Sequence, residues 1–298
     1  MNTGSKLAAF GVGVAAIFGG AMAVGAAVGP IGVGGDAHSV DVTAAVSASD
    51  MPRGLAVSSD GLRLVVESDS VPTDSASRFA FRIVDESGSP VGEFDELHER
   101  RLHLIVVSRN LVDYWHLHPA LDDTGVWTAD LPALSPGSYR VFADFQPAGG
   151  ANITLGTDIT VAGTVAPVDL PEPSRTDSVD GYTVRLSGDP KIGPAELSFA
   201  VALDGESVRT EPYLGAAGHL VAIRHGDMAF LHVHPHEDDT GDAVTFTGEF
   251  PTAGTFRLFL DFAHDGEVRT AAFTVVVPDA PPTHGDASMT TSSHVEGH

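Results

Sequence analysis

Cysteine is missing from this 298-residue sequence, and lysine occurs only twice, as Lys6 and Lys191. Without cysteine, the chain has no disulfides, thiolate zinc sites, iron–sulfur clusters or cysteine nucleophiles. Basic residues are scarce as well, because 16 Lys and Arg stand against 40 Asp and Glu, for a formal net charge of −24. Such a chain is repelled by phosphate backbones, so nucleic acid is excluded as a partner, whereas cations are attracted.

Motifs of common catalytic sites are also missing. The sequence contains no Gly-x-Ser-x-Gly, no His-Glu-x-x-His and no paired acid constellation. We therefore predict a protein that is not an enzyme. A hydrolase or oxidase with an open three-histidine metal position is the remaining catalytic alternative, and metal-dependent turnover would reveal it.

The N-terminus contains an uncharged run of 29 − 7 + 1 = 23 residues, from Leu7 to Gly29, which is long enough to cross a bilayer. Ala21-Met22-Ala23 has the small-x-small form of a signal-peptidase site. Residues 1–30 are therefore either a signal peptide or a membrane anchor. Because Lys6 precedes the run and no basic residue follows it closely, we expect the rest of the chain to be extracytoplasmic, anchored to the cell membrane or secreted.

Two blocks of the sequence are copies of one unit. His103-Leu104 matches His219-Leu220 at an offset of 219 − 103 = 116 residues, and His116-x-His118-Pro119 matches His232-x-His234-Pro235. The blocks cover residues 61–163 and 181–277. We interpret residues 31–60 as a flexible tether, 164–180 as a Pro-rich linker and 278–298 as a disordered, histidine-containing tail.

Each unit contains about seven short runs rich in Val, Leu, Phe and Ile, separated by Gly, Pro, Asp and Ser. Helical periodicity is weak. The pattern predicts an all-β protein of two tandem immunoglobulin-like β-sandwich domains, preceded by one N-terminal hydrophobic helix that is transmembrane or part of a signal peptide.

The repeated histidines fall on one face of a predicted hairpin in each unit, because alternate residues of a strand share a face. A hairpin centred on Asn110-Leu111 pairs residues whose numbers sum to 221, and one centred on Gly226-Asp227 pairs residues whose numbers sum to 453. This register sets His103 opposite His118 with His116 beside them, and His219 opposite His234 with His232 diagonal. The other face then forms the core, with Leu104, Val106, Trp115 and Leu117 in the first unit and Leu220, Ala222, Leu231 and Val233 in the second.

Three imidazoles at such spacing can reach one ion at about 2.0–2.1 Å. We therefore predict a divalent transition metal in each unit, with copper favoured over zinc or nickel because it heads the affinity series. The predicted ligands are His103, His116, His118, His219, His232 and His234. Asp144 and Asp261 recur at equivalent positions of the two copies. Each is a candidate fourth ligand or an acceptor that fixes a histidine tautomer; the alternative is a strand-end carboxylate that pairs with Arg140 or Arg257 or caps a turn. His98 is either an extra ligand or a loop residue.

At His103, His116-Leu117-His118-Pro119 and the strand from Arg140 to Phe145, both units resemble a group of exported actinobacterial proteins described as heavy-metal-binding. More loosely, the architecture is similar to YtkA-like and CopC-type periplasmic β-sandwiches. The resemblance implies metal sequestration, or delivery to a membrane metal-handling protein. The chain lacks the Met-rich ligands and the Cys-x-x-x-Cys of better-known copper carriers, which leaves the ion open.

The alternative to a metal protein is a tandem immunoglobulin-like interaction module. In that case buried hydrogen bonds between histidine and aspartate hold the sandwich together without any ion.

Overall fold

The computed structural model describes residues 52–231, 233–236 and 243–279. They all belong to one compact unit, Val46–His298. The expected N-terminal helix at 1–30, most of the tether and nearly all of the tail lie outside the described residues. Within the described ranges, no helix has the length and apolar character needed to cross a membrane.

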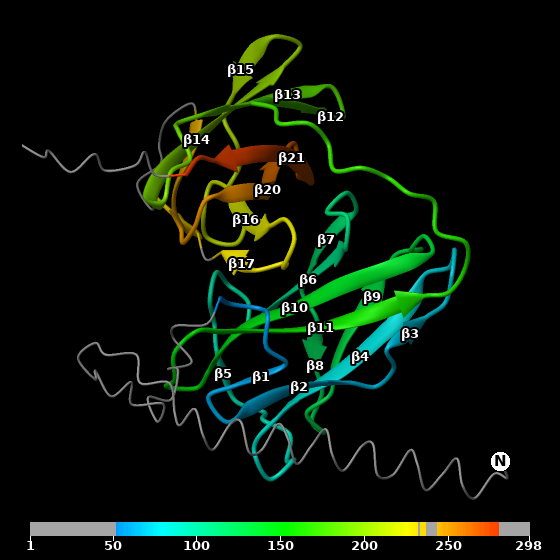
Figure 1. Ribbon diagram of the computed structural model, residues 1–298. Helices are drawn as coiled ribbons and strands as arrows, with labels where there is room; N and C mark the ends of the chain where they lie inside the picture. The colour runs from blue at the N-terminus through cyan, green and yellow to red at the C-terminus, as the bar shows by residue number, and fades with distance from the viewer. Residues whose placement is uncertain (1–51, 232, 237–242, 280–298) are drawn as a thin grey trace, which may run out of the picture. The chain divides into compact units, whose positions relative to one another are not determined.

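The first sandwich consists of two sheets that can be followed in Figure 1. A five-stranded sheet has the order β1 (Ser58–Ser59), β2 (Leu62–Val66), β4 (Ser77–Val84), β9 (Trp127–Leu131) and β8 (Ala120–Leu121). A six-stranded sheet has the order β3 (Ser70–Val71), β11 (Ile153–Val161), β10 (Gly137–Pro147), β6 (Leu102–Ser108) and β7 (Tyr114–Leu117), with β5 (Phe94–Asp95) paired to β10.

The second sandwich repeats this plan. One sheet has the order β12 (Thr176–Val179), β13 (Tyr182–Ser187), β14 (Gly193–Leu203), β19 (Ala243–Phe250) and β18 (Val233–Pro235), with β15 (Glu206–Val208) paired to β14. The other has the order β17 (Phe230–Leu231), β16 (His219–Arg224), β20 (Gly254–His264) and β21 (Glu267–Val277). The predicted all-β fold of two tandem immunoglobulin-like sandwiches is confirmed.

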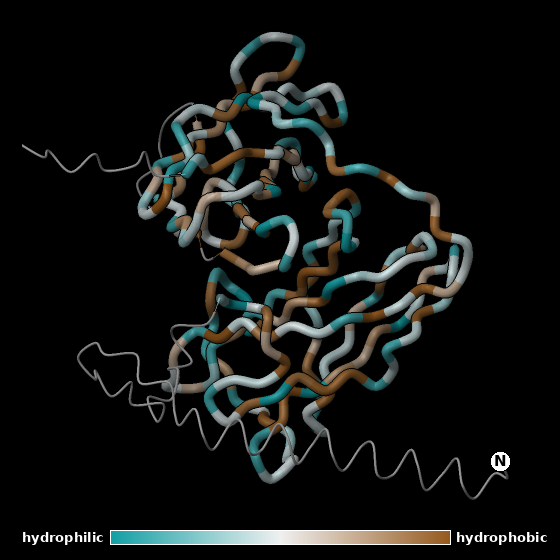
Figure 2. The backbone as a smooth tube through the Cα atoms, in the orientation of Figure 1, coloured by the Kyte–Doolittle hydropathy of each residue, from teal (hydrophilic) through white to brown (hydrophobic). Residues whose placement is uncertain are grey.

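Each sandwich has its own apolar core. Alternate side chains of a strand point inward, and hydrophobic and hydrophilic residues alternate along many strands (Figure 2). Trp127 and Phe81 lie in the core of the first sandwich, and Phe199 and Phe273 lie in the core of the second. The predicted core face of each histidine hairpin is confirmed, because all eight of its residues belong to these two clusters or pack against them.

The ends of the expected tether and linker belong to the fold. Arg53 forms an isolated bridge with Phe230, and the amide of Gly54 donates to the carbonyl of Thr154 at 3.0 Å. Residues 58–59 form β1, and residues 176–179 of the expected linker form β12. The composition of both segments, rich in Ala, Ser and Pro, predicts flexible chain outside the sandwiches. Composition does not register the backbone pairing that holds them.

A third apolar cluster joins the two sandwiches. It contains the residues that share a strand face with the histidines: Ile105 and Val107 from β6, and Val221 and Ile223 from β16. Phe142, Phe230 and Phe259 also belong to it, with Tyr114 packed against it. Because β6 is buried along its whole length, both faces of this strand are covered.

The contacts between the sandwiches obey an internal two-fold relation. Tyr114 stacks on Phe259 with ring centroids 4.1 Å apart, and the equivalent pair, Phe230 and Phe142, has centroids 5.3 Å apart. His103 lies beside its own copy, His219, at a centroid distance of 5.8 Å. A residue that contacts its own copy lies on the pseudo-symmetry axis. The two histidine faces therefore meet at that axis.

Candidate metal centre

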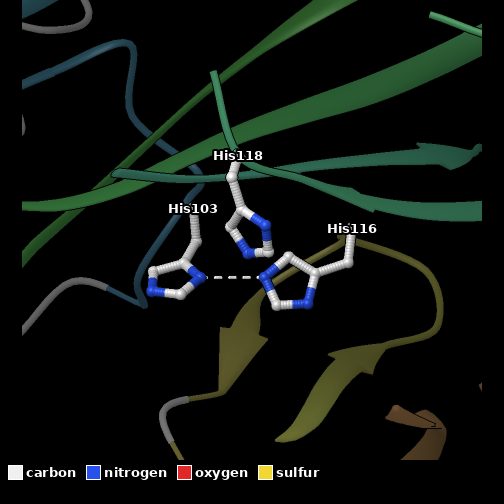
Figure 3. A group of neighbouring side chains, drawn as sticks. All are labelled: His103, His116 and His118. Carbon is white, nitrogen blue, oxygen red and sulfur yellow. Dashed lines mark hydrogen bonds between the residues drawn. The ribbon is translucent and has the colours of Figure 1, made fainter. Parts of the chain in front are cut away.

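Three imidazoles of the first sandwich converge, as Figure 3 shows. The pairs of β6 and β7, such as Leu104 with Leu117 and Ile105 with His116, have the predicted sum of 221. His103 therefore projects from β6 toward His116 on β7 and His118 just beyond it. One nitrogen from each ring lies within 4.8 Å of the other two.

Hydrogen bonds determine which nitrogens face the centre. The Nε2 of His103 lies 3.0 Å from the carbonyl oxygen of Leu97, and the Nδ1 of His116 lies 2.8 Å from Oδ2 of Asp261. Since a carbonyl and a carboxylate accept, both nitrogens are assigned as donors. A neutral imidazole has only one N–H, so His103 Nδ1 and His116 Nε2 both carry lone pairs.

These two lone-pair nitrogens face each other at 2.9 Å. When both rings are neutral and protonated on their outward nitrogens, neither inward nitrogen has a hydrogen to donate, whereas a second proton on either ring would make this contact a hydrogen bond. Nε2 of His118 is buried and has no hydrogen-bond partner among the described residues. A cation bound to all three nitrogens would give His118 Nε2 a partner and would accept the lone pairs of His103 Nδ1 and His116 Nε2.

Burial favours the neutral form of His103, His118 and His219. The pKa of His103 is lowered to about 4 and that of His118 to about 3, in each case mainly by burial and next by the neighbouring His116. The pKa of His219 is lowered to about 3 by burial and then by His116 and His98. Neutral imidazole is the form that binds metal ions, so the rings are ready to act as ligands at neutral pH.

Asp261 on β20 of the second sandwich reaches into this centre. Its carboxylate is buried and accepts from the hydroxyl of Thr270 at 2.6 Å, from His116 Nδ1 at 2.8 Å and from the hydroxyl of Tyr114 at 3.3 Å. Burial, followed by the charge of Asp261, raises the pKa of Tyr114 well above its usual value. Asp261 thus accepts from a predicted ligand, although the ligand belongs to the other sandwich.

Asp144 occupies the equivalent position of the first sandwich. Its Oδ1 accepts from the Thr154 hydroxyl at 2.7 Å and from the Asn152 amide at 3.2 Å. The expected pairing of the two aspartates with Arg140 and Arg257 is not what the structure shows. Arg140 bonds to Asp158 and the backbone of residues 54–55, and Arg257 bonds to Thr274 and the Leu111 carbonyl.

His219 lies beside the first triad. Its ring centroid is 5.8 Å from that of His103 and 4.9 Å from that of His98. A cavity runs along this group of side chains, and it is lined by His98, His103, His116, Asp144 and His219 together with apolar residues such as Phe230. His98 has a φ of 49° in the turn before β6 and lies beside the triad.

The register of the second hairpin is confirmed only in its first part. Ala222 pairs with Leu231 and Ile223 with Phe230, which matches the predicted sum of 453. Beyond Leu231, however, the chain changes sheets, and the backbone of His234 pairs with Thr247 instead of lying opposite His219. His232 and the His234 side chain lie outside the described residues, so the second triad stays a prediction.

The contact between the sandwiches was not predicted from the sequence. As a result, the positions of Asp261, Tyr114 and His219 beside the first triad were missed as well. The available signal was the uninterrupted apolar stretch from Leu104 to Val107. Such a stretch indicates a strand that is covered on both faces. It does not say which segment provides the second cover.

The family model described as a domain of unknown function (DUF8832) matches the chain twice, over residues 56–163 and 177–279. The chain belongs to this family. No curated protein matches the sequence.

Several solved structures show distant similarity. A DUF4426 family protein from Pseudomonas aeruginosa has 12% identity and a TM-score of 0.28, over 36% of this chain and 100% of that one. The Escherichia coli adhesin FdeC has 17% identity and a TM-score of 0.26, over 75% of this chain and 66% of that one. The N-terminal Ig1-2 module of the Drosophila receptor protein tyrosine phosphatase DLAR has 6% identity and a TM-score of 0.20, over 73% and 98%. At these scores the similarities say nothing about function.

Proposed function

We propose that the protein binds a divalent transition metal ion through His103, His116 and His118, with copper favoured over zinc and nickel. The observation that carries this proposal is the convergence of three ring nitrogens, one from each histidine, within 4.8 Å of one another. Two of them face each other at 2.9 Å, and the third is buried without a hydrogen-bond partner among the described residues. Metal coordination uses lone pairs of this kind.

The spacing of the nitrogens suits one ion. Two bonds of about 2.0–2.1 Å can bridge nitrogens up to about 4.2 Å apart, which includes the 2.9 Å between His103 and His116. The three nitrogens lie within 4.8 Å of one another, so ion binding would draw the His118 ring toward the other two. Three neutral imidazoles without any thiolate favour Cu(II), Zn(II) or Ni(II), and copper has the highest affinity in this series.

The biological role that fits these features is extracytoplasmic metal sequestration, or delivery of the ion to a membrane metal-handling protein. The hydrophobic run before Gly29 supports export, and the net charge of −24 favours the approach of cations. A second site on His219, His232 and His234 belongs to the same proposal.

A second candidate function is a metal-free interaction module. The hydrogen bond between His116 and Asp261 favours it, because this bond already joins the two sandwiches without an ion. In that case the histidine cluster only strengthens the apolar contact between them.

Competitive titration of the full-length protein with Cu(II) against a chelator of known affinity separates the two functions. We expect His116→Ala to weaken the site of the first sandwich by more than about 100-fold, above the 10–100-fold effect of losing an outer-shell partner, and so to remove one tightly bound ion per chain. His225→Ala is the matched control, because His225 is exposed at the β16–β17 turn. Equal affinity in the two variants, or no stoichiometric binding by the wild type, would leave the interaction module as the better function.

A further inference from the structure

We infer that Asp261 of the second sandwich is the positioning residue for the metal site of the first sandwich, so that metal binding and docking of the sandwiches stabilise each other. The inference rests on the proposed metal binding and adds to it a residue and a coupling. It starts from the pair formed by His116 and Asp261, which are 145 residues apart in the sequence.

The contact between His116 and Asp261 is sheltered from water. The two side chains are only 5% and 3% exposed, and the atoms involved are 2.8 Å apart. A carboxylate that accepts from one imidazole nitrogen holds the ring in one orientation and one tautomer. Here the proton is held on Nδ1, and Nε2 is left bare toward His103.

The duplication provides an internal comparison for this role. Asp144 pairs across the ladder with His103, and Asp261 pairs with His219, so the two aspartates have the same place in their sheets. Each also accepts from a threonine of the next strand. The contact of Asp261 with His116 crosses from one sandwich to the other and therefore arises from their docking. The residue equivalent to His116 is His232, which lies outside the described residues.

A reciprocal coupling follows from this arrangement. Asp261 reaches His116 only while the sandwiches are docked, so an ion that needs a bare Nε2 binds the docked form more tightly. By thermodynamic linkage, the same ion then opposes separation of the sandwiches. The stacked rings of Tyr114 and Phe259 lie in this interface and would be protected together with it.

The tautomer can be tested on the unmodified, metal-free protein. Long-range 1H–15N correlation spectra of the histidine side chains distinguish an Nδ1–H from an Nε2–H imidazole. We expect His116 to carry its proton on Nδ1 and His103 on Nε2. A proton on Nε2 of His116 would overturn the inference, and this result does not depend on whether any variant folds.

Substitution tests the coupling. Asp261→Asn can present an amide N–H to Nδ1 and shift the His116 proton to Nε2, the nitrogen needed by the ion. We expect a loss of about 10–100-fold in Cu(II) affinity. Asp144→Asn, the matched substitution in the first sandwich, should cause a smaller loss. Asp158→Asn removes the same charge away from the centre, where Asp158 pairs with Arg109, and should change the affinity by no more than about threefold.

A docking measurement complements the affinity measurement. We expect Cu(II) to raise the unfolding midpoint of the wild type and of Asp158→Asn, and to raise it much less in Asp261→Asn. If the wild type binds no metal, both the proposed function and this inference fail. If the wild type binds metal and folded Asp261→Asn binds it equally well, only the inference fails.

Discussion

The two sandwiches carry the same histidine motif on hairpins whose ladders differ in length. In the first, β6 and β7 remain paired as far as Leu104 with Leu117, and three rings converge beyond that point. In the second, the ladder between β16 and β17 ends at Ala222 with Leu231, and β18 then joins the other sheet. A repeated motif therefore does not ensure a repeated backbone path, because the hairpin ladder ends at a different point in each copy.

The two sandwiches can also be compared through the hydrogen bonds of their equivalent aspartates. Asp144 and Asp261 occupy equivalent places and bond to equivalent threonines. Asp261 also accepts from His116 of the other sandwich. This contact shows that a strand residue of one sandwich can supply a partner to the histidine hairpin of the other.

The largest expected effect tests the apolar contact between the sandwiches. Phe142 and Phe259 are equivalent and almost fully buried. Replacing either with Ala should lower the free energy of unfolding by about 3–5 kcal/mol. Phe259→Ala should cost about 0.5–1.5 kcal/mol more, because Tyr114 stacks on Phe259 with an interplanar angle of 7°, whereas the Phe142–Phe230 pair is tilted by 49°. Urea unfolding followed by circular dichroism measures both changes, and costs below about 1 kcal/mol would contradict the packing.

The next effect is a loss of stability in acid. The folded pKa values of His103, His118 and His219 lie at about 4, 3 and 3, below the ordinary value of 6.5. Between these limits the unfolded chain binds more protons than the folded chain. Stability is therefore fully present above pH 6.5 and falls as the pH drops toward 4, with a slope of up to about 1.4 kcal/mol per pH unit for each additional proton.

Unfolding of the metal-free protein at a series of pH values measures this slope. His103→Gln in the first sandwich and His219→Gln in the second should each make the dependence of stability on pH less steep. A stability that stays constant between pH 6.5 and 4 would show that the rings are not buried in neutral form.

A smaller effect on stability is expected from substitutions at equivalent positions of β11 and β21. A Cβ at Gly156 would overlap the carbonyl oxygen of Gly54, because the segment before β1 passes over this strand. Gly156→Ala should therefore destabilise the protein by about 1–3 kcal/mol. The equivalent residue of the second sandwich is Ala272, and Ala272→Gly should cost only about 0.5–1 kcal/mol. Thermal unfolding compares the two, and equal costs would argue against the close approach of Gly54.

The smallest effect concerns the hairpin turns. Arg224 donates to Asp227 at 2.9 Å in the second sandwich, whereas Ser108 and Asn110 form the turn of the first through neutral hydrogen bonds. Asp227→Asn should lower stability by about 0.2–1 kcal/mol, and added salt should reduce the difference. Asn110→Asp gives the comparison in the first turn. A salt-insensitive loss above 1 kcal/mol would mean that Asp227 acts mainly through the amide of Ala229.

Much of the fold and of the first site could be predicted from local pattern. The repeat defined two equivalent units, and the alternation of Leu104 and Val106 with His103 and Ile105 placed the histidines on one face. The hairpin sums of 221 and 453 follow from turn position alone, and both agree with the observed pairs. Period and turn chemistry are local, so a single sequence contains them.

The remaining features depend on contacts between distant segments. Asp261 and His116 are 145 residues apart, and no periodicity connects them. The same holds for Arg53 and Phe230, whose pairing draws the end of the expected tether into the fold. The sheet change after Leu231 also depends on β19 offering a free edge, and such an edge is a property of the assembled sandwich.

X-ray absorption spectroscopy at one equivalent of Cu(II) tests the central claim most directly, because it counts the imidazoles bound to the ion. For the full-length protein carrying His234→Ala, which removes the second predicted triad, the account predicts at least three imidazole nitrogens at about 2.0–2.1 Å, and one fewer when His116→Ala is added. A spectrum that shows mainly oxygen ligands, or the same number of imidazoles in both proteins, would contradict it.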